Sequence, residues 1–271
     1  MPSAFDRASA VQQLAASSNG QVAFTAQVPI GWDQGRGAFG GLVLGLLARA
    51  AIAAEIDKSR SLRTLLGDIA APVQPGEVQL IARTLRRGNS QSNLAVELSQ
   101  NGEVLSLGSA VLASARKPTM PEFALDVPAP APDWRTIEIA RVRPPQGPAF
   151  GQHIEFRPVL GLPFSGAPNP DVRGYVRLVG QDGPLDAPAL IALLDAHWPG
   201  VLSMATGPRV ASTVSFAGEI FCDPVSLDWQ EPLDYRSRIV AQHAGYFLEL
   251  RELWQRGSPV AMNQQTLALI R

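Results

Sequence analysis

The feature that most constrains this chain is a pattern that occurs twice. An apolar, helix-like segment, GGLVLGLLARAAIAAEIDK (40–58), is followed by short β-type runs separated by Gly, Asn and Pro. A second helix-like segment, LDAPALIALLDAHWPG (185–200), is followed by β-type runs in the same way. Aligned by eye, GLVLGLLARA (41–50) matches ALIALLDAHW (189–198) in its apolar positions. A repeat of this size indicates two copies of one α+β unit.

The strands of each unit read as an antiparallel meander. In the alignment of the halves, LAVELSQNGEVLSLGSAVLA lies over ELRELWQRGSPVAMNQQTLA, with Gly102 over Gly257. Asn101-Gly102 is a strong hairpin signal. We predict helices near 40–57 and 186–198.

A proline-rich stretch separates the two units. From Lys117 the segment KPTMPEFALDVPAPAPDW has no apolar period and is typical of a surface linker. The predicted organisation is an N-terminal unit over 1–116, a linker over 117–135 and a C-terminal unit over 136–271.

Composition limits the class of protein and its partners. Of the 271 residues, 46% are hydrophobic and 17% charged, which is typical of a globular chain. A formal net charge of −1 gives no overall field for nucleic acid or an anionic membrane. The sequence has neither a signal-peptide pattern nor an apolar run of ~20 residues. With one cysteine, Cys222, no internal disulfide can form. We therefore predict a cytoplasmic protein without nucleic-acid or membrane partners.

The stretch GRGAFGG (35–41) contains Gly35, Gly37 and Gly40 in the spacing of a dinucleotide-binding fingerprint. That interpretation requires a parallel βαβ unit, whereas an antiparallel meander follows here. Two other interpretations remain open. The glycines can allow tight packing of helix on sheet, or they can bring the free N–H groups of a helix start close to an anion or a developing oxyanion.

One apolar helix wrapped by antiparallel strands, present twice, is the double hotdog arrangement. The residues resemble the acyl-CoA thioesterase II type within the hotdog thioesterases. The similar segments are GAFGGLVLGLLARAA, RTLRRGNSQSNLAVELSQNGEVL, LLDAHWPG, ASTVSF and VAMNQQTLALIR. The resemblance implies an α+β fold in which two antiparallel sheets each wrap one long helix. It also implies a homodimer or larger assembly and a place in fatty acid metabolism.

The resemblance assigns the candidate site residue by residue. The catalytic aspartate falls on Asp195, the threonine on Thr213 and the glutamine on Gln265. In the family, these three hold and polarise the water that attacks the thioester. A slip of one residue in the last strand would bring Gln264 to that face instead. Candidate substrate-binding residues are Gly40 and Gly41 at the helix start and Asn89 and Ser90 in RGNS.

The residue types suit this chemistry. A carboxylate can take a proton from water, and hydroxyl and amide groups can hold that water in place. Asp195 lies in an otherwise apolar helix, where a charge is costly without partners. The alternative is a structural or solvent-facing Asp. In the alignment of the halves Asp195 corresponds to Leu47, which predicts one active site per chain.

The resemblance implies an enzyme that hydrolyses an acyl-CoA to a free acid and coenzyme A. Two other functions remain open: a non-catalytic acyl-CoA binding protein on the same fold, and a hotdog hydratase acting on an enoyl thioester. The hydratase usually needs an Asp and a His acting together, and Asp195 and His197 are poorly spaced for that. The sequence carries no HExxH or Cys/His cluster, so we predict no metal. We also predict no cofactor, since coenzyme A is part of the acyl-CoA substrate.

Overall fold

A computed structural model describes residues 2–14, 20–117, 119–121, 127 and 129–270. Part of the predicted linker over 117–135 therefore lies outside the described residues.

From the N-terminus, the elements are α1 (Ala4–Ala8), β1 (Val11–Gln13), β2 (Gln21–Val28), β3 (Asp33–Gln34), β4 (Gly37–Ala38), α2 (Gly40–Ala54), β5 (Ser61–Ile69), β6 (Gly76–Arg87), β7 (Gln91–Gln100), β8 (Glu103–Ala113), η1 (Trp134–Thr136), η2 (Ala149–His153), β9 (Ile154–Leu160), β10 (Val172–Leu178), α3 (Ala187–Ala196), α4 (Val201–Met204), β11 (Val210–Ile220), η3 (Pro224–Ser226), β12 (Leu233–His243), β13 (Tyr246–Gln255) and β14 (Ser258–Ile270).

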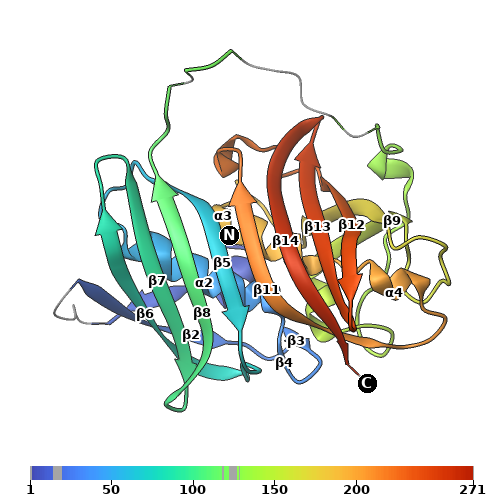
Figure 1. Ribbon diagram of the computed structural model, residues 1–271, viewed down its shortest axis with the longest axis horizontal. Coiled ribbons are helices and arrows are strands. Elements are labelled where there is room, and N and C mark those ends of the chain that lie inside the picture. Colours follow the sequence, from blue (N-terminus) through green and yellow to red (C-terminus); the bar gives the residue numbers. More distant parts are fainter. Residues whose placement is uncertain (1, 15–19, 118, 122–126, 128, 271) are drawn as a thin grey trace.

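The large strands form one antiparallel sheet rather than the two that the sequence led us to expect. Its 12 strands follow the order β1-β2-β6-β7-β8-β5-β11-β14-β13-β12-β10-β9, so each half of the chain supplies one half of the sheet (Figure 1). The halves join where β5 pairs with β11, with Gly67 opposite Phe216 and Leu65 opposite Gly218. Two separate sheets would each leave an unpaired edge here, and pairing these edges satisfies their backbone N–H and C=O groups.

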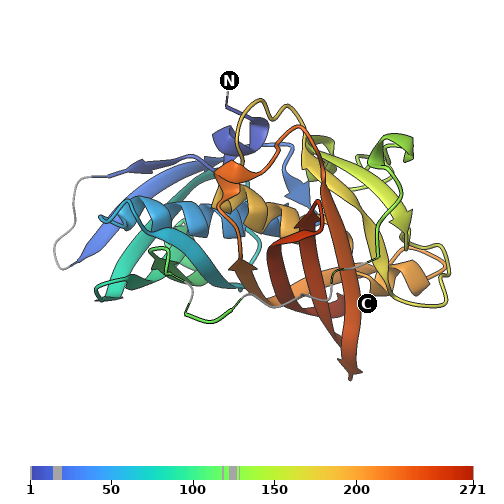
Figure 2. The same ribbon diagram turned by 90° about the horizontal axis from the view of Figure 1, so that it is seen from above.

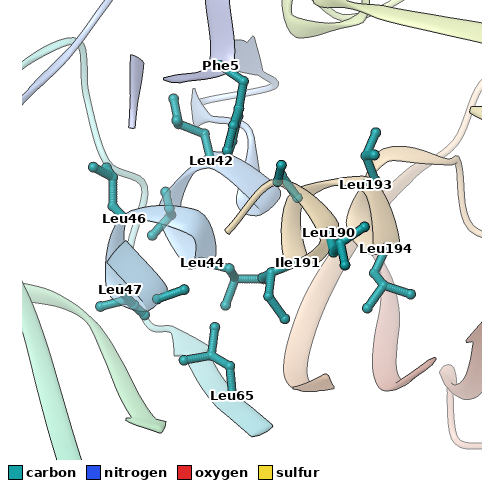
Figure 3. Packing of buried hydrophobic residues seen from close by; sticks show 14 of the residues in the cluster. Phe5, Leu42, Leu44, Leu46, Leu47, Leu65, Leu190, Ile191, Leu193 and Leu194 are labelled. Carbon is teal, nitrogen blue, oxygen red and sulfur yellow. The ribbon is translucent and has the colours of Figure 1, made fainter. Parts of the chain in front are cut away.

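Helices α2 and α3 lie side by side on the same face of the sheet (Figure 2). They run antiparallel, because Gly41 lies against Ala192 and Gly45 lies close to Pro188. Their contact forms the centre of the core, where Leu44 of α2 points toward Ile191 of α3 above Leu65 of β5 (Figure 3). The start of α2 therefore lies near the end of α3, and the start of α3 lies near the middle of α2, where Arg49 pairs with Asp186.

Both helices are shorter than predicted. Helix α2 has 15 residues and ends at Ala54, since Glu55 is already extended. Helix α3 has 10 residues; the Asp186 side chain caps its start by accepting from the Ala189 N–H, and His197 is extended at its end. Pro199 lies two residues further on and disfavours helical backbone at the residue before it. This early end places Asp195 in the last turn of α3.

Candidate active site

Asp195, Thr213 and Gln265 meet in the C-terminal half, although they come from α3, β11 and β14. The Gln265 Nε2 group donates to Asp195 Oδ1 at 2.9 Å and to Thr213 Oγ1 at 2.6 Å. Asp195 and Gln265 are buried, with exposed fractions of 7% and 1%, whereas Thr213 is half-buried. Gln264 is exposed on the opposite face of the sheet and is not part of this cluster. One amide thus links the carboxylate to the hydroxyl.

The start of helix α2 lies directly against the Asp195 carboxylate. A Cβ atom at Gly40 would lie only 2.7 Å from Asp195 Oδ2, so this position has no room for a side chain. The Gly41 N–H donates a hydrogen bond to the carboxylate. Phe39, the residue before the helix, provides no side-chain cap, so a residue of the other half does so. The positive end of the helix dipole faces a negative charge.

Burial raises the pKa of Asp195 above its ordinary value, because the carboxylate has lost its contact with water. Three groups oppose this rise: the Arg251 guanidinium, the Gln265 amide and the Gly41 N–H. The Arg251 Nη1 atom lies 3.6 Å from Asp195 Oδ1. A carboxyl group with a raised pKa beside polar groups from several strands is typical of a functional site.

The N-terminal half is apolar at the equivalent positions. Leu47 corresponds to Asp195 in the alignment of the helices, and Ala110 corresponds to Gln265 in that of the hairpins. Leu62 corresponds to Thr213, since the strand register shifts directly after each of them. The three residues of the N-terminal half are buried in the core. At these equivalent positions, therefore, the C-terminal half alone brings together an acid, a hydroxyl and an amide.

Family models match most of the chain. Residues 28–115 match the acyl-CoA thioesterase N-terminal domain, and residues 121–269 match the acyl-CoA thioesterase C-terminal domain. The chain belongs to the acyl-CoA thioesterase family. Membership of this family supports thioester hydrolysis as its general activity. A search of curated proteins finds no match.

Solved structures with this fold cover nearly the whole length of the thioesterase chain. A hot dog fold protein of unknown function from Alicyclobacillus acidocaldarius is 24% identical, with a TM-score of 0.85, covering 99% of this chain and 98% of the other. A putative thioesterase II from Thermobifida fusca is 23% identical, with a TM-score of 0.81 and the same coverage. An acyl-CoA thioesterase II from Mycobacterium marinum is 17% identical, with a TM-score of 0.75, covering 98% of each chain. These likenesses establish the hotdog fold.

Asn89 and Ser90, the other two candidate substrate-binding residues, lie away from Asp195. They form the turn between β6 and β7, where the Arg60 guanidinium donates to the Asn89 carbonyl oxygen at 3.3 Å. Arg60 follows the C-terminal end of α2, whereas Asp195 lies at its start. A helix of 15 residues separates the two places by about 20 Å. The RGNS motif can be recognised from the local sequence, but its distance from Asp195 depends on the direction of α2.

Two charged residues at the site were missed by the sequence analysis. Glu249 and Arg251 of β13 are buried, and they lie on the same face of the strand as each other. The signal was present in the alignment of the halves, in which they lie over Leu94 and Val96. A charge in the place of a buried apolar residue indicates a role that the fold alone does not require.

His197 is buried next to this site, with its ring stacked on Tyr235 at a centroid distance of 3.9 Å. Burial lowers the pKa of His197 to about 3, so the ring is neutral near pH 7. Among the described residues, neither ring nitrogen finds a hydrogen-bond partner. His197 thus makes no hydrogen bond to Asp195, and it gives no support to the Asp–His pair that a hydratase uses.

Three further features concern the class of site and of protein. Burial raises the pKa of the half-buried Cys222 thiol to about 11, so it is protonated near pH 7 and a poor nucleophile. Within the described part of the chain, no three His, Cys, Asp or Glu side chains are grouped so as to hold a metal ion. None of the described helices has the length and apolar character needed to cross a membrane.

A cavity of about 650 Å³ lies between α4 and the strands β12, β13 and β14. Its apolar lining includes Val201, Met204, Ile239, Phe247 and Leu269. Leu269 lies four residues after Gln265 on β14, so both side chains point to the helix-facing side of the sheet. A partly apolar space, with Thr206, Arg209 and Gln242 also in its lining, thus lies along the same strand as the polar cluster.

Proposed function

We propose that this protein hydrolyses the thioester of an acyl-CoA to a free acid and coenzyme A at a single site formed by Asp195, Thr213 and Gln265. The observation that carries the proposal is the pair of hydrogen bonds from Gln265 to Asp195 and Thr213, in a buried cluster at the start of α2. A buried carboxylate there has no structural counterpart in the first half, where Leu47 stands.

In the proposed reaction Asp195 is the general base. It takes a proton from a water molecule as the water oxygen attacks the thioester carbon, and it returns the proton to the sulfur as the C–S bond breaks. Gln265 already donates to Thr213 Oγ1, which leaves the Thr213 hydroxyl hydrogen free to hold the water. The raised pKa of Asp195 makes it a stronger base than an exposed carboxylate.

The helix start supplies the remaining requirement, a donor for the carbonyl oxygen as it gains negative charge. The Gly41 N–H is occupied by Asp195, so we assign this role to the N–H of Gly40, the first residue of α2. The apolar cavity beside α4 suits the acyl chain, because burying a chain against Val201, Phe247 and Leu269 removes apolar surface from water.

The test is turnover of a panel of acyl-CoAs by the wild-type protein and by Asp195→Asn, with a thiol reagent that detects released coenzyme A. Asn keeps the shape but cannot accept the proton, so we expect kcat to fall ~10²–10⁴-fold. Binding of a non-hydrolysable thioether analogue should change little.

Gln264→Asn, on the opposite face of the sheet, is the matched control and should retain activity. Full activity of Asp195→Asn would reject Asp195 as the base. Tight binding of acyl-CoA by a wild-type protein that releases no thiol would instead favour a non-catalytic binding protein.

A further inference from the structure

A buried ion pair lies behind Asp195. The Arg251 and Glu249 side chains, exposed by 1% and 0%, are joined by Nη2 and Oε2 at 3.2 Å. The second Glu249 oxygen accepts the Gly200 N–H at 3.0 Å. Glu249 is therefore fixed by the segment that follows α3, and it fixes Arg251 in turn.

Arg251 reaches α3 with its other terminal nitrogen. The Nη1 atom donates to the Leu194 carbonyl oxygen at 3.3 Å and lies 3.6 Å from Asp195 Oδ1. The guanidinium thus holds the backbone of the residue before Asp195 and places a positive charge beside the carboxylate. The second distance is too long for a good hydrogen bond, so the effect on Asp195 is electrostatic.

The fold itself does not require these charges. In the first half, Leu94 and Val96 occupy the equivalent places on β7: Leu94 pairs with Ala110 as Glu249 pairs with Gln265. Moving two charges out of water is costly, and an apolar pair of similar volume is often as stable or more so. The second half has these charges beside Asp195, a buried acid that a nearby cation stabilises in its ionised form.

Among the described groups that face Asp195, Arg251 carries the positive charge. From β13, Arg251 favours the carboxylate and Glu249 disfavours it, and from β12 Tyr235 interacts with it. His197, two residues further on, is neutral near pH 7. Helix α2 contributes a backbone N–H, and β11 and β14 contribute the uncharged Thr213 and Gln265.

We propose that Arg251 is a positioning residue that keeps Asp195 ionised and oriented, and that Glu249 holds Arg251 in place. This rests on the proposed function, in which the ionised Asp195 is the base. A purely structural ion pair would affect stability and leave the ionisation of Asp195 unchanged.

The first half supplies the test variant. Glu249→Leu/Arg251→Val copies Leu94 and Val96 and removes both members of the Glu249–Arg251 pair together, so we expect it to fold with a Tm close to that of the wild type. Without the cation, the pH at which Asp195 ionises should rise by about one unit or more. Glu249→Gln keeps a side chain of the same shape beside Arg251 and the Gly200 N–H, so Arg251 stays in place, and it removes the anion; the pH at which Asp195 ionises should then fall, an effect of opposite sign. Arg251→Lys keeps the positive charge and should rescue most of the change.

The ionisation of Asp195 is measured directly by carboxyl ¹³C NMR titration of Asp-labelled protein, with the Asp195 signal identified by its loss in Asp195→Asn. This readout does not depend on turnover, so it stands even if the wild type hydrolyses no acyl-CoA. For an active enzyme, the acid limb of kcat should move with the NMR titration while KM changes little. An unchanged titration in both Glu249→Leu/Arg251→Val and Glu249→Gln would overturn the proposal. If the double variant does not fold, an unchanged titration in Glu249→Gln alone does so.

Discussion

The residues around Asp195 illustrate how a site sets the ionisation of its groups through burial. Asp195 and His197 are two residues apart and both buried, and burial disfavours the charged form of each. The pKa of the carboxyl group therefore rises and that of the imidazole falls. Asp195 has Arg251, Gln265 and the Gly41 N–H to favour its ionised form, whereas His197 has an aromatic neighbour, Tyr235. This difference in partners is the reason that we propose Asp195, and not His197, as the base.

The buried His197 predicts a loss of stability in acid. The unfolded chain takes up a proton near pH 6.5, but the folded protein cannot do so until about pH 3, so stability falls as the pH drops through this window. His197→Phe keeps an aromatic ring against Tyr235 and removes this proton. At pH 4.5 we expect the variant to lose roughly 2–3 kcal/mol less of its free energy of unfolding than the wild type, relative to pH 7.

Urea unfolding at the two pH values measures this difference. His243→Phe changes an exposed histidine instead and serves as the control. Equal losses in His197→Phe and the wild type would show that His197 is protonated in the folded protein at pH 4.5.

At the scale of elements, the antiparallel packing of α2 against α3 builds the site. It brings the first turn of α2 to the last turn of α3, so that free N–H groups meet a carboxylate. The same packing explains the glycines. Gly41 has Phe39 and the Ala192 carbonyl within 3 Å of its absent side chain, and Gly40 faces Asp195. Tight packing and an N–H group close to an anion thus occur together at this helix start, and Gly41 takes part in both.

Gly40→Ala tests the close approach of α2 to the acid. The new methyl group would lie 2.7 Å from Asp195 Oδ2 and 3.3 Å from Ile69 Cδ1, so the carboxylate must move. Since misplacement of a reacting group by about 1 Å can cost ~10²-fold, we expect kcat to fall by at least about tenfold. The Tm should change little, because alanine favours the helix.

Steady-state kinetics and thermal unfolding measure the two effects. Gly183→Ala introduces the same methyl group into open space and should behave as the wild type does. Wild-type kcat in Gly40→Ala would show that the position of the Asp195 carboxylate against α2 is not needed.

At the scale of the whole molecule, two similar halves differ in the residues that they place around a shared core. One continuous sheet and two antiparallel helices give the chain an approximate symmetry that would allow two equivalent sites. The C-terminal half carries Asp195, Thr213 and Gln265, while the N-terminal half carries Leu47, Leu62 and Ala110 and contributes the start of α2. Each half thus supplies a part that the other lacks.

This division predicts one binding site per chain. Calorimetric titration with a thioether analogue of acyl-CoA should give one analogue bound for each chain, and Asp195→Asn should keep that ratio. Leu47→Asp places an acid at the equivalent position of the first half, where no hydroxyl and amide accompany it, so it should add no second site. Two analogues bound per wild-type chain would contradict the prediction.

The amino-acid sequence alone was enough to predict the repeat and the type and order of the main elements, and its resemblance to the thioesterases named Asp195, Thr213 and Gln265 as candidates, which the structure brings together. Apolar periodicity, Asn101-Gly102 and Pro199-Gly200 are local signals, because each one sets the backbone preference of its own segment. It could not determine that β5 and β11 join two half-sheets into one, because edge pairing depends on strands about 150 residues apart.

Packing in three dimensions selected the residues that share the site. The direction of α2 places Gly40 and Gly41 against Asp195 and puts Asn89 and Ser90 at the far end of the helix. In the sequence, Glu249 and Arg251 look like the charged positions of an ordinary alternating strand. Their position behind Asp195 in the folded chain is what suggests a role for them. The energy of a charge depends on what surrounds it in space, and neighbours in space are set by packing rather than by the local sequence.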